Sequence, residues 1–203
     1  MIFPDLNWWQ ANVWQPDDAF RLTPEVWEYY RNKAQIAAEE PVAHITEIGV
    51  RFGYSAAAFL CAYPQAHYFG IDLINGGHGG VGGGTDTFPA VRLMLAKLFP
   101  EANVTLVHFD SRQLTSFPPA DLFHVDADHD TEPAYRDIEK AFNAALPGNR
   151  ILVDDYTFLG SVKQACDRFR DRFTLVTDCV VRPSLRGDFL IRKLPHEAVE
   201  HPV

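Results

Sequence analysis

A run of acids with one histidine follows an apolar segment in the middle of the chain, in LFHVDADHD from Leu122 to Asp130. It places Asp126, Asp128, His129 and Asp130 within five residues. Neighbouring carboxylates are costly to bury, because they lose hydration and each raises the pKa of the next. A cation held between such oxygens removes that cost. The run therefore indicates metal or acid–base chemistry where a buried strand ends.

A second pair of acids, Asp154 and Asp155, follows another apolar run in ILVDDY, residues 151–156. If the two runs are neighbouring parallel strands, these acids and Asp126 converge at one edge of a sheet. Ligand sets made only of oxygen suit a hard divalent cation, and Mg²⁺ is the default choice. The alternative is that the acids cap helices and bind nothing, as we expect for Asp130.

The elements that must position these acids alternate between strand and helix patterns. This alternation predicts right-handed βαβ crossovers and a parallel sheet covered on both faces. The first helix is expected from Thr23 to about Glu40, with Thr23 as its cap and Pro24 in its first turn. Further strands are expected at 42–50, 67–74, 103–110, 120–127 and 150–156, and further helices at 55–63, 88–99, 132–146 and 161–173.

The last two expected strands, 174–181 and 188–194, have only RPSLRG between them, so they predict an antiparallel hairpin. The expected fold is α/β: a doubly wound, Rossmann-like and mostly parallel sheet with helices on both faces and an antiparallel C-terminal hairpin. A chain of 203 residues suits one hydrophobic core. We expect a single domain with an aromatic and helical extension at 1–40, a core at 41–194 and a tail at 195–203.

Composition restricts the partners. A net charge of −9 argues against nucleic acid as the main partner, because phosphate binding needs a basic surface. No apolar run is long enough to span a bilayer, and the first residues lack the pattern of a signal peptide. Three dispersed cysteines, Cys61, Cys166 and Cys179, suit reduced thiols. We therefore expect a cytoplasmic protein with a small-molecule substrate, no nucleic-acid partner and no membrane partner.

The segment EIGVRFGYS, which ends the strand expected at 42–50, could form part of a cofactor site. Its Glu47, Gly49, Gly53 and Ser55 would let the backbone approach a ligand and offer free N–H groups at a helix start. Arg51 stands where the dinucleotide fingerprint has a glycine. The alternative is a plain strand-to-helix turn capped by Ser55.

Two further acids end the next two expected strands. Asp72 follows Gly49 by 23 residues, where a carboxylate can accept both hydroxyls of a ribose. Asp110 is placed to accept from an adenine amino group, or equally to cap the turn that follows, which begins with Ser111.

Together, the Glu47–Gly49 motif, the two acids and the closing hairpin resemble a class I S-adenosylmethionine-dependent methyltransferase, over roughly residues 43–193. The resemblance implies a seven-stranded sheet. It also implies that Glu47 and Gly49 line the methionine end of the cofactor, with Asp72 on the ribose and Asp110 near the adenine. The full expected set for S-adenosylmethionine is Glu47, Gly49, Gly53, Ser55, Asp72, Asp110, Ser111 and Asp126.

The pattern DADHD…VDDY resembles the metal-dependent O-methyltransferases, particularly those that act on the sugars of macrolide antibiotics. Catechol-type enzymes share the single Asp and the paired acids. By that likeness Asp126, Asp154 and Asp155 hold Mg²⁺ or another divalent cation, and His129 is the catalytic base. The expected activity is Mg-dependent O-methylation of a hydroxyl on a glycosyl or polyhydroxy natural product.

Several alternatives remain open. A methyltransferase fold could use its metal for hydroxylation or hydrolysis, and an NAD-linked oxidoreductase is weakened by Arg51 and the hairpin. The glycine-rich segment 75–86 is either a lid or a linker. Trp8, Trp9 and Trp14 would either roof the acceptor pocket or pack at a subunit interface of a homo-oligomer.

Overall fold

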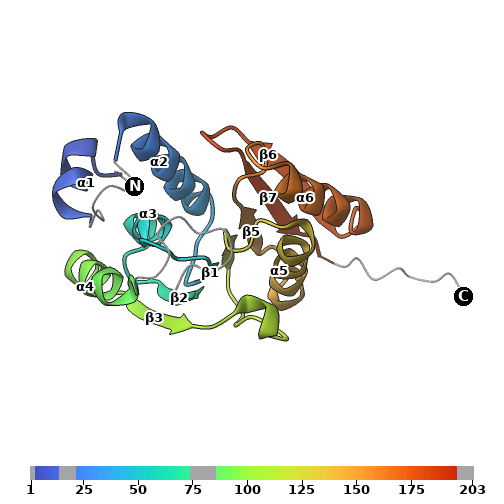
Figure 1. Ribbon diagram of the computed structural model, residues 1–203, viewed down its shortest axis with the longest axis horizontal. Coiled ribbons are helices and arrows are strands. Elements are labelled where there is room, and N and C mark those ends of the chain that lie inside the picture. The colour runs from blue at the N-terminus through green and yellow to red at the C-terminus, as the bar shows by residue number, and fades with distance from the viewer. Residues whose placement is uncertain (1–2, 14–21, 74–85, 196–203) are drawn as a thin grey trace, which may run out of the picture.

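A seven-stranded sheet forms the centre of the computed structural model, which describes residues 3–13, 22–73 and 86–195 (Figure 1). The strand order is β3-β2-β1-β4-β5-β7-β6. The first five strands pair in parallel, while β7 pairs antiparallel with both β5 and β6. The strands are β1 (His44–Ile48), β2 (His67–Asp72), β3 (Asn103–His108), β4 (Leu122–Val125), β5 (Arg150–Val153), β6 (Thr177–Arg182) and β7 (Asp188–Lys193). The expected mostly parallel sheet with a closing hairpin is confirmed.

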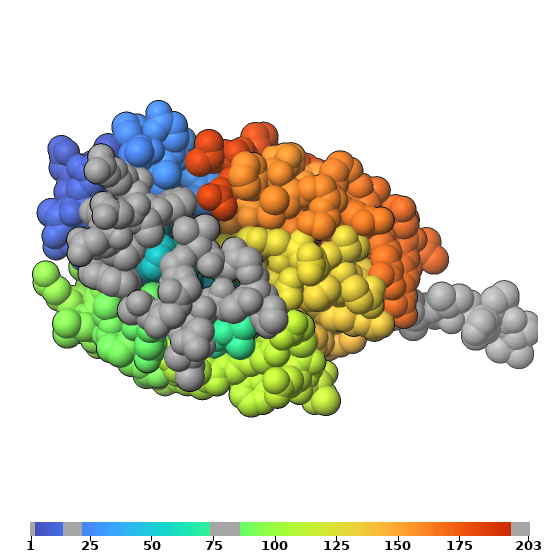
Figure 2. Space-filling model, viewed as in Figure 1, coloured from blue at the N-terminus to red at the C-terminus, as the bar shows by residue number. Residues whose placement is uncertain are grey.

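Helices cover both faces of this sheet. The helices are α1 (Leu6–Asn12), α2 (Pro24–Ala38), α3 (Tyr54–Ala62), α4 (Phe88–Leu98), α5 (Thr131–Ala144) and α6 (Gly160–Arg172), and η1 (Ser111–Gln113) is a short 3₁₀ turn. The apolar residues of α1 to α4 share one core cluster, and those of α5 and α6 share the other. Figure 2 shows α5 in yellow beside α6 in orange. Among the described helices, none combines the length and apolarity that a bilayer-spanning segment needs.

Alternation along β4 decides which side chains face which core. Phe123 and Val125 point into the core under α5 and α6. Leu122 points to the opposite core, under α2 and α3. Because side chains alternate along a strand, His124 shares the face of Leu122 and lies beneath α2. Asp126 follows β4 and Asp154 follows β5 in the same alternation. Both acids therefore lie on the side of the sheet that α2 covers.

Helix α2 is tied to β5 at its C-terminal end. Thr23 caps its first turn, as expected. The buried Arg150 donates from Nη1 to the carbonyl of Ile36 (2.6 Å) and from Nη2 to those of Ala37 (3.0 Å) and Glu40 (3.2 Å). These carbonyls lie at and just beyond the C-terminal end of the helix, where backbone acceptors lack the full set of helical donors. The guanidinium therefore fixes where α2 lies over the sheet.

The N-terminal aromatic residues pack inside the chain. Trp9 is fully buried and stacks on Tyr30 of α2 at 5.9 Å between ring centroids. Within the described part of the chain, Trp9 therefore braces α2 as a core residue. Trp14 and almost all of the glycine-rich segment 75–86 lie outside the described residues, and Asp86 is its only described member.

Candidate active site

The carboxyl ends of β1 and β4 approach each other closely at Gly49. Its φ of +92° favours glycine, and a Cβ there would lie 1.9 Å from the carbonyl oxygen of Asp126. A glycine is therefore required at position 49, because the backbones at the ends of these two strands lie too close together for a side chain. Gly53, with φ +73°, has a packing role, because its Cβ would lie 2.7 Å from Cγ1 of Val91.

Asp72 is held at the end of β2 by backbone donors. One oxygen accepts from the N–H of Arg51 and the other from the N–H of Leu73, both at 2.6 Å. Arg51 adopts a left-handed φ of +48°, so the residue that replaces the expected glycine still makes the tight turn. Burial raises the pKa of Asp72, while these hydrogen bonds oppose the shift. Lone pairs remain on both oxygens for a diol.

Asp110 and Ser111 follow β3. Asp110 accepts from the backbone N–H of Arg112 and from its guanidinium, which lowers the pKa of this carboxyl. The capping alternative is therefore observed, and the half-buried carboxylate still faces the same edge as Asp72. The hydroxyl of Ser111 is buried and donates to Asp137 at 2.7 Å.

Glu47 and Ser55 lie deeper than expected. Glu47 is fully buried and accepts hydrogen bonds from the hydroxyls of Ser55 and Tyr68, one on each oxygen. Its Oε1 also lies 2.9 Å from Nδ1 of His124, the residue opposite it on β4. Both oxygens of Glu47 therefore bind side chains of the protein itself. Among the expected cofactor residues, the half-buried ones are Gly49 and the three acids Asp72, Asp110 and Asp126.

Asp126, His129 and Asp155 meet at the ends of β4 and β5. Nε2 of His129 lies 3.5 Å from Oδ1 of Asp126 and 3.4 Å from Oδ2 of Asp155. One donor atom from each of the three residues lies within 4.8 Å of the other two. Arg186, from the β6–β7 connection, approaches Oδ1 of Asp155 at 3.3 Å. We call Asp126, His129 and Asp155 the rim cluster.

Asp155 is unusual in two respects. Its backbone is left-handed, with φ +61°, which is uncommon for a residue with a side chain. Its side chain is 1% exposed, and Oδ2 has no hydrogen-bond donor. A buried carboxylate oxygen without a donor is costly unless a cation or water satisfies it.

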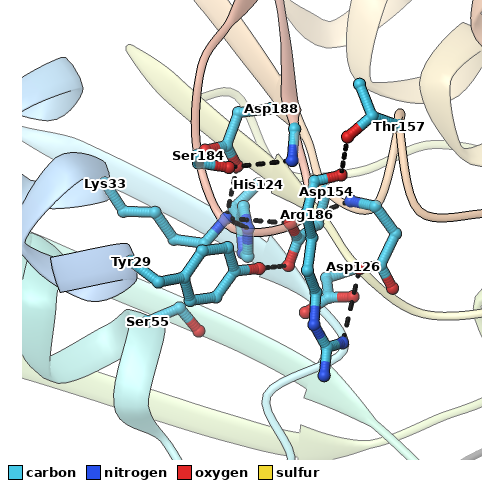
Figure 3. Close-up of polar contacts among 12 residues, drawn as sticks. Tyr29, Lys33, Ser55, His124, Asp126, Asp154, Thr157, Ser184, Arg186 and Asp188 are labelled. Carbon is cyan, nitrogen blue, oxygen red and sulfur yellow. Dashed lines mark hydrogen bonds and ion pairs between the residues drawn. The ribbon is translucent and has the colours of Figure 1, made fainter. Parts of the chain in front are cut away.

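The neighbouring Asp154 has different surroundings (Figure 3). It accepts a hydrogen bond from the hydroxyl of Tyr29, and its Oδ1 lies 3.2 Å from Nζ of Lys33. That oxygen also accepts the N–H of Asp155 at 2.8 Å. Lys33 is fully buried and donates to Oδ1 of Asp188 at 2.6 Å. The Asp154 side chain thus binds two residues of α2 and the N–H of Asp155, and Lys33 links it to Asp188 of β7.

The pKa values of the neighbouring Asp154 and Asp155 are shifted in opposite directions. Burial and the charge of Asp154 raise the pKa of Asp126 to about 7, and burial likewise raises the pKa of Asp155. For Asp154 burial acts upward too and is the largest single influence, but the charge of Lys33 and the hydrogen bonds from Tyr29 and the N–H of Asp155 act together to lower the pKa. Burial and the neighbouring negative charge therefore act on both carboxylates of the rim cluster in the same direction, and the contact of Arg186 with Asp155 only partly opposes them.

The expected triad of Asp126, Asp154 and Asp155 is thus brought to one edge of the sheet. The ammonium group of Lys33 also lies there, in contact with Asp154. Asp126 and Asp154 can also share an ion with His124 by distance. The sequence analysis did not identify Lys33, Tyr29, Asp188 or Arg186 as residues of the site. One sequence signal was available. Tyr29 and Lys33 are four residues apart, so they share one face of the helix, and an aromatic residue on that face indicates that the lysine also points toward the core.

The role expected for Asp130 is only partly right. It occupies the N-cap position of α5, but its side chain makes no capping hydrogen bond. Instead Oδ1 of Asp128 accepts the N–H of Asp130 at 3.0 Å, so the preceding acid closes the turn.

Comparisons with known proteins agree with this architecture. The family described as a methyltransferase domain matches residues 46–156. The search of curated proteins finds no match. Among solved structures, the O-methyltransferase TomG from Streptomyces achromogenes, in complex with SAM, is 15% identical, with 82% of this chain and 79% of that chain covered and a TM-score of 0.60.

Two further structures extend the comparison. The SAH-bound methyltransferase PaMTH1 from Podospora anserina is 19% identical, with 95% of this chain and 89% of that chain covered and a TM-score of 0.62. The O-methyltransferase NovP is 14% identical, with coverage of 94% and 89% and a TM-score of 0.61. At these identities the likeness concerns the fold.

Proposed function

Because this chain belongs to the methyltransferase-domain family, we propose that it transfers the methyl group of S-adenosylmethionine to a hydroxyl of a small molecule, with the help of a divalent cation. The observation that carries the proposal is the rim cluster, in which two carboxylates and an imidazole meet beside the Gly49 turn. The family favours this activity over an NAD-linked oxidoreductase.

The cofactor would bind along the ends of β1 to β4. Asp72 is the residue to accept the ribose hydroxyls, because it is half-buried and its oxygens keep lone pairs beyond those used by Arg51 and Leu73. Asp110 would lie near the adenine, and Asp126 near the methionine end. Glu47, Ser55 and Ser111 would shape the site from within through the partners described above.

The rim cluster fits a hard cation. Asp155 offers a buried oxygen without a donor, Asp126 offers a half-exposed carboxylate, and burial raises the pKa of both. When bound there, Mg²⁺ or a similar ion would lower the pKa of a hydroxyl that it coordinates and would fix the orientation of that hydroxyl. Asp154 belongs to the expected ligand set as well, but both of its oxygens already accept hydrogen bonds within the protein.

His129 would act as the general base. Methyl transfer forms an O–C bond and breaks the S–C bond, so the acceptor hydroxyl must give up its proton. A neutral imidazole can take that proton on one ring nitrogen, while the other lies beside the two carboxylates of the rim cluster. The charge left on His129 is then stabilised by Asp126.

A glycosyl or polyhydroxy acceptor suits a site with paired carboxylates, because neighbouring hydroxyls can bind one cation together. The three cysteines form no disulfide, which supports the proposed cytoplasmic setting. We also propose that neither nucleic acid nor membrane is a partner.

Two measurements test this function. Calorimetry should show binding of S-adenosylmethionine, and product analysis with a panel of hydroxylated acceptors should show S-adenosylhomocysteine formed only when an acceptor is present. Both are repeated with Mg²⁺ and with EDTA. Turnover that is unaffected by EDTA would remove the cation from the mechanism, and failure to bind S-adenosylmethionine would remove the function.

A further inference from the structure

A row of buried polar side chains crosses the sheet beneath α2. Glu47 on β1 lies opposite His124 on β4, and Nε2 of His124 lies 3.3 Å from Nζ of Lys33. Lys33 in turn contacts Asp154 at the end of β5 and Asp188 at the start of β7. Each side chain of this row is at most 3% exposed. Such a row is stable only if its charges are balanced internally.

Lys33 provides that balance on the side nearest the rim cluster. Its ammonium is shared between Asp154 and Asp188, and Tyr29 from the preceding helical turn donates to the second oxygen of Asp154 (Figure 3). Both oxygens of Asp154 therefore have donors. Asp155, one residue later, keeps an oxygen without a donor.

We propose that Lys33 keeps the Asp154 carboxylate bound inside the protein, so that Asp154 is not a metal ligand. A divalent cation at the rim cluster is then held by Asp126 and Asp155 alone. The proposal rests on the proposed function, since it concerns the same cation. In this arrangement Lys33 is a positioning residue. Asp154, fixed by Lys33 and Tyr29, accepts the N–H of Asp155 and stabilises the left-handed backbone that directs the Asp155 carboxylate toward Asp126.

The decisive variant replaces Lys33 and Asp154 together, Lys33→Met with Asp154→Asn. Its net charge equals that of the wild type, but Asp188 loses its contact with Lys33. A second variant, Asp154→Asn alone, therefore accompanies it, because this variant keeps the buried Lys33–Asp188 pair. The amide oxygen of the new side chain can still accept the N–H of Asp155. Mn²⁺ binding is measured at pH 8 by calorimetry and by loss of the free-ion EPR signal.

The double variant should bind Mn²⁺ within about fivefold of the wild type, whereas Asp126→Asn should weaken binding by about 30-fold or more, because it removes a charged ligand. Lys33→Met alone should tighten Mn²⁺ binding by about tenfold, because it frees the charge of Asp154 for the ion. If the variants that lack Lys33 do not fold, Asp154→Asn alone decides the question, and it should bind Mn²⁺ within about fivefold of the wild type.

Arg150→Met is the matched structural control, since Arg150 ties the same helix to the same strand away from the acids. It should lower thermal stability and leave Mn²⁺ affinity unchanged. A loss of affinity beyond fivefold in the double variant would make Asp154 a ligand and overturn the inference. A wild type that binds no Mn²⁺ would instead refute the cation in the proposed function itself.

Discussion

The two halves of the candidate site hold their acids in different ways. At the ends of β2 and β3, Asp72 and Asp110 are bound by donors close in sequence, from Arg51, Leu73 and Arg112. At the ends of β4 and β5, the partners of Asp154 come from residues more than a hundred positions earlier, on α2. The first half is a set of local turns, while the second depends on tertiary packing. Substitutions should therefore act locally in the first half and cooperatively in the second.

The largest effect is expected from Asp155→Asn. Loss of this carboxylate removes a proposed cation ligand, and a cation supplies several kcal/mol of charge stabilisation, so turnover should fall by roughly 10⁴-fold. Affinity for S-adenosylmethionine, measured by calorimetry, should stay within about threefold, because the cofactor half does not depend on Asp155. Asp130→Asn, which removes an exposed acid at the same edge, is the control and should retain full turnover. Equal losses in both variants would contradict a specific role.

His129→Gln should slow methyl transfer by ~10²–10⁴-fold, the usual contribution of a general base. The hydrogen bond to Asp126 raises the pKa of His129, and only the neutral imidazole accepts a proton. The wild-type rate should therefore rise with pH as His129 loses its proton. This acid limb should be absent from the pH profile of the variant. A variant that keeps the same limb would assign the titration to another group.

The difference between the two halves also explains what the sequence could predict. Strand and helix order, the closing hairpin and the convergence of Asp126, Asp154 and Asp155 follow from short patterns, because apolar runs and strand ends are local features. Lys33 could not be identified in this way, since an amphipathic helix does not show which of its polar residues is covered. The burial of Glu47 was missed for a related reason: its partners Tyr68 and His124 lie on other strands.

Asp72→Asn probes the local half and should weaken S-adenosylmethionine binding by about tenfold or more, because hydrogen bonds to a charged group contribute roughly 1.5–3 kcal/mol. Asp110→Asn should have a smaller effect, since its carboxylate is already paired with Arg112. Calorimetry of both variants in EDTA isolates the cofactor from the cation. The reverse order of affinities would assign the ribose contact to the wrong acid.

The smallest effect on cofactor binding is expected for Gly53→Ala, although Gly53 belongs to the cofactor motif. Its Cβ would meet Val91, and its φ is positive, so the substitution should lower the free energy of unfolding by about 1–3 kcal/mol. The variant Gly53→Ala/Val91→Ala should recover part of that loss, because it removes the atom in the way. Denaturant titration measures the stability, and calorimetry measures the cofactor affinity. The affinity of Gly53→Ala for S-adenosylmethionine could instead fall below that of Asp72→Asn while its stability stayed the same. Gly53 would then contact the cofactor directly, and its packing against Val91 would not explain its presence in the motif.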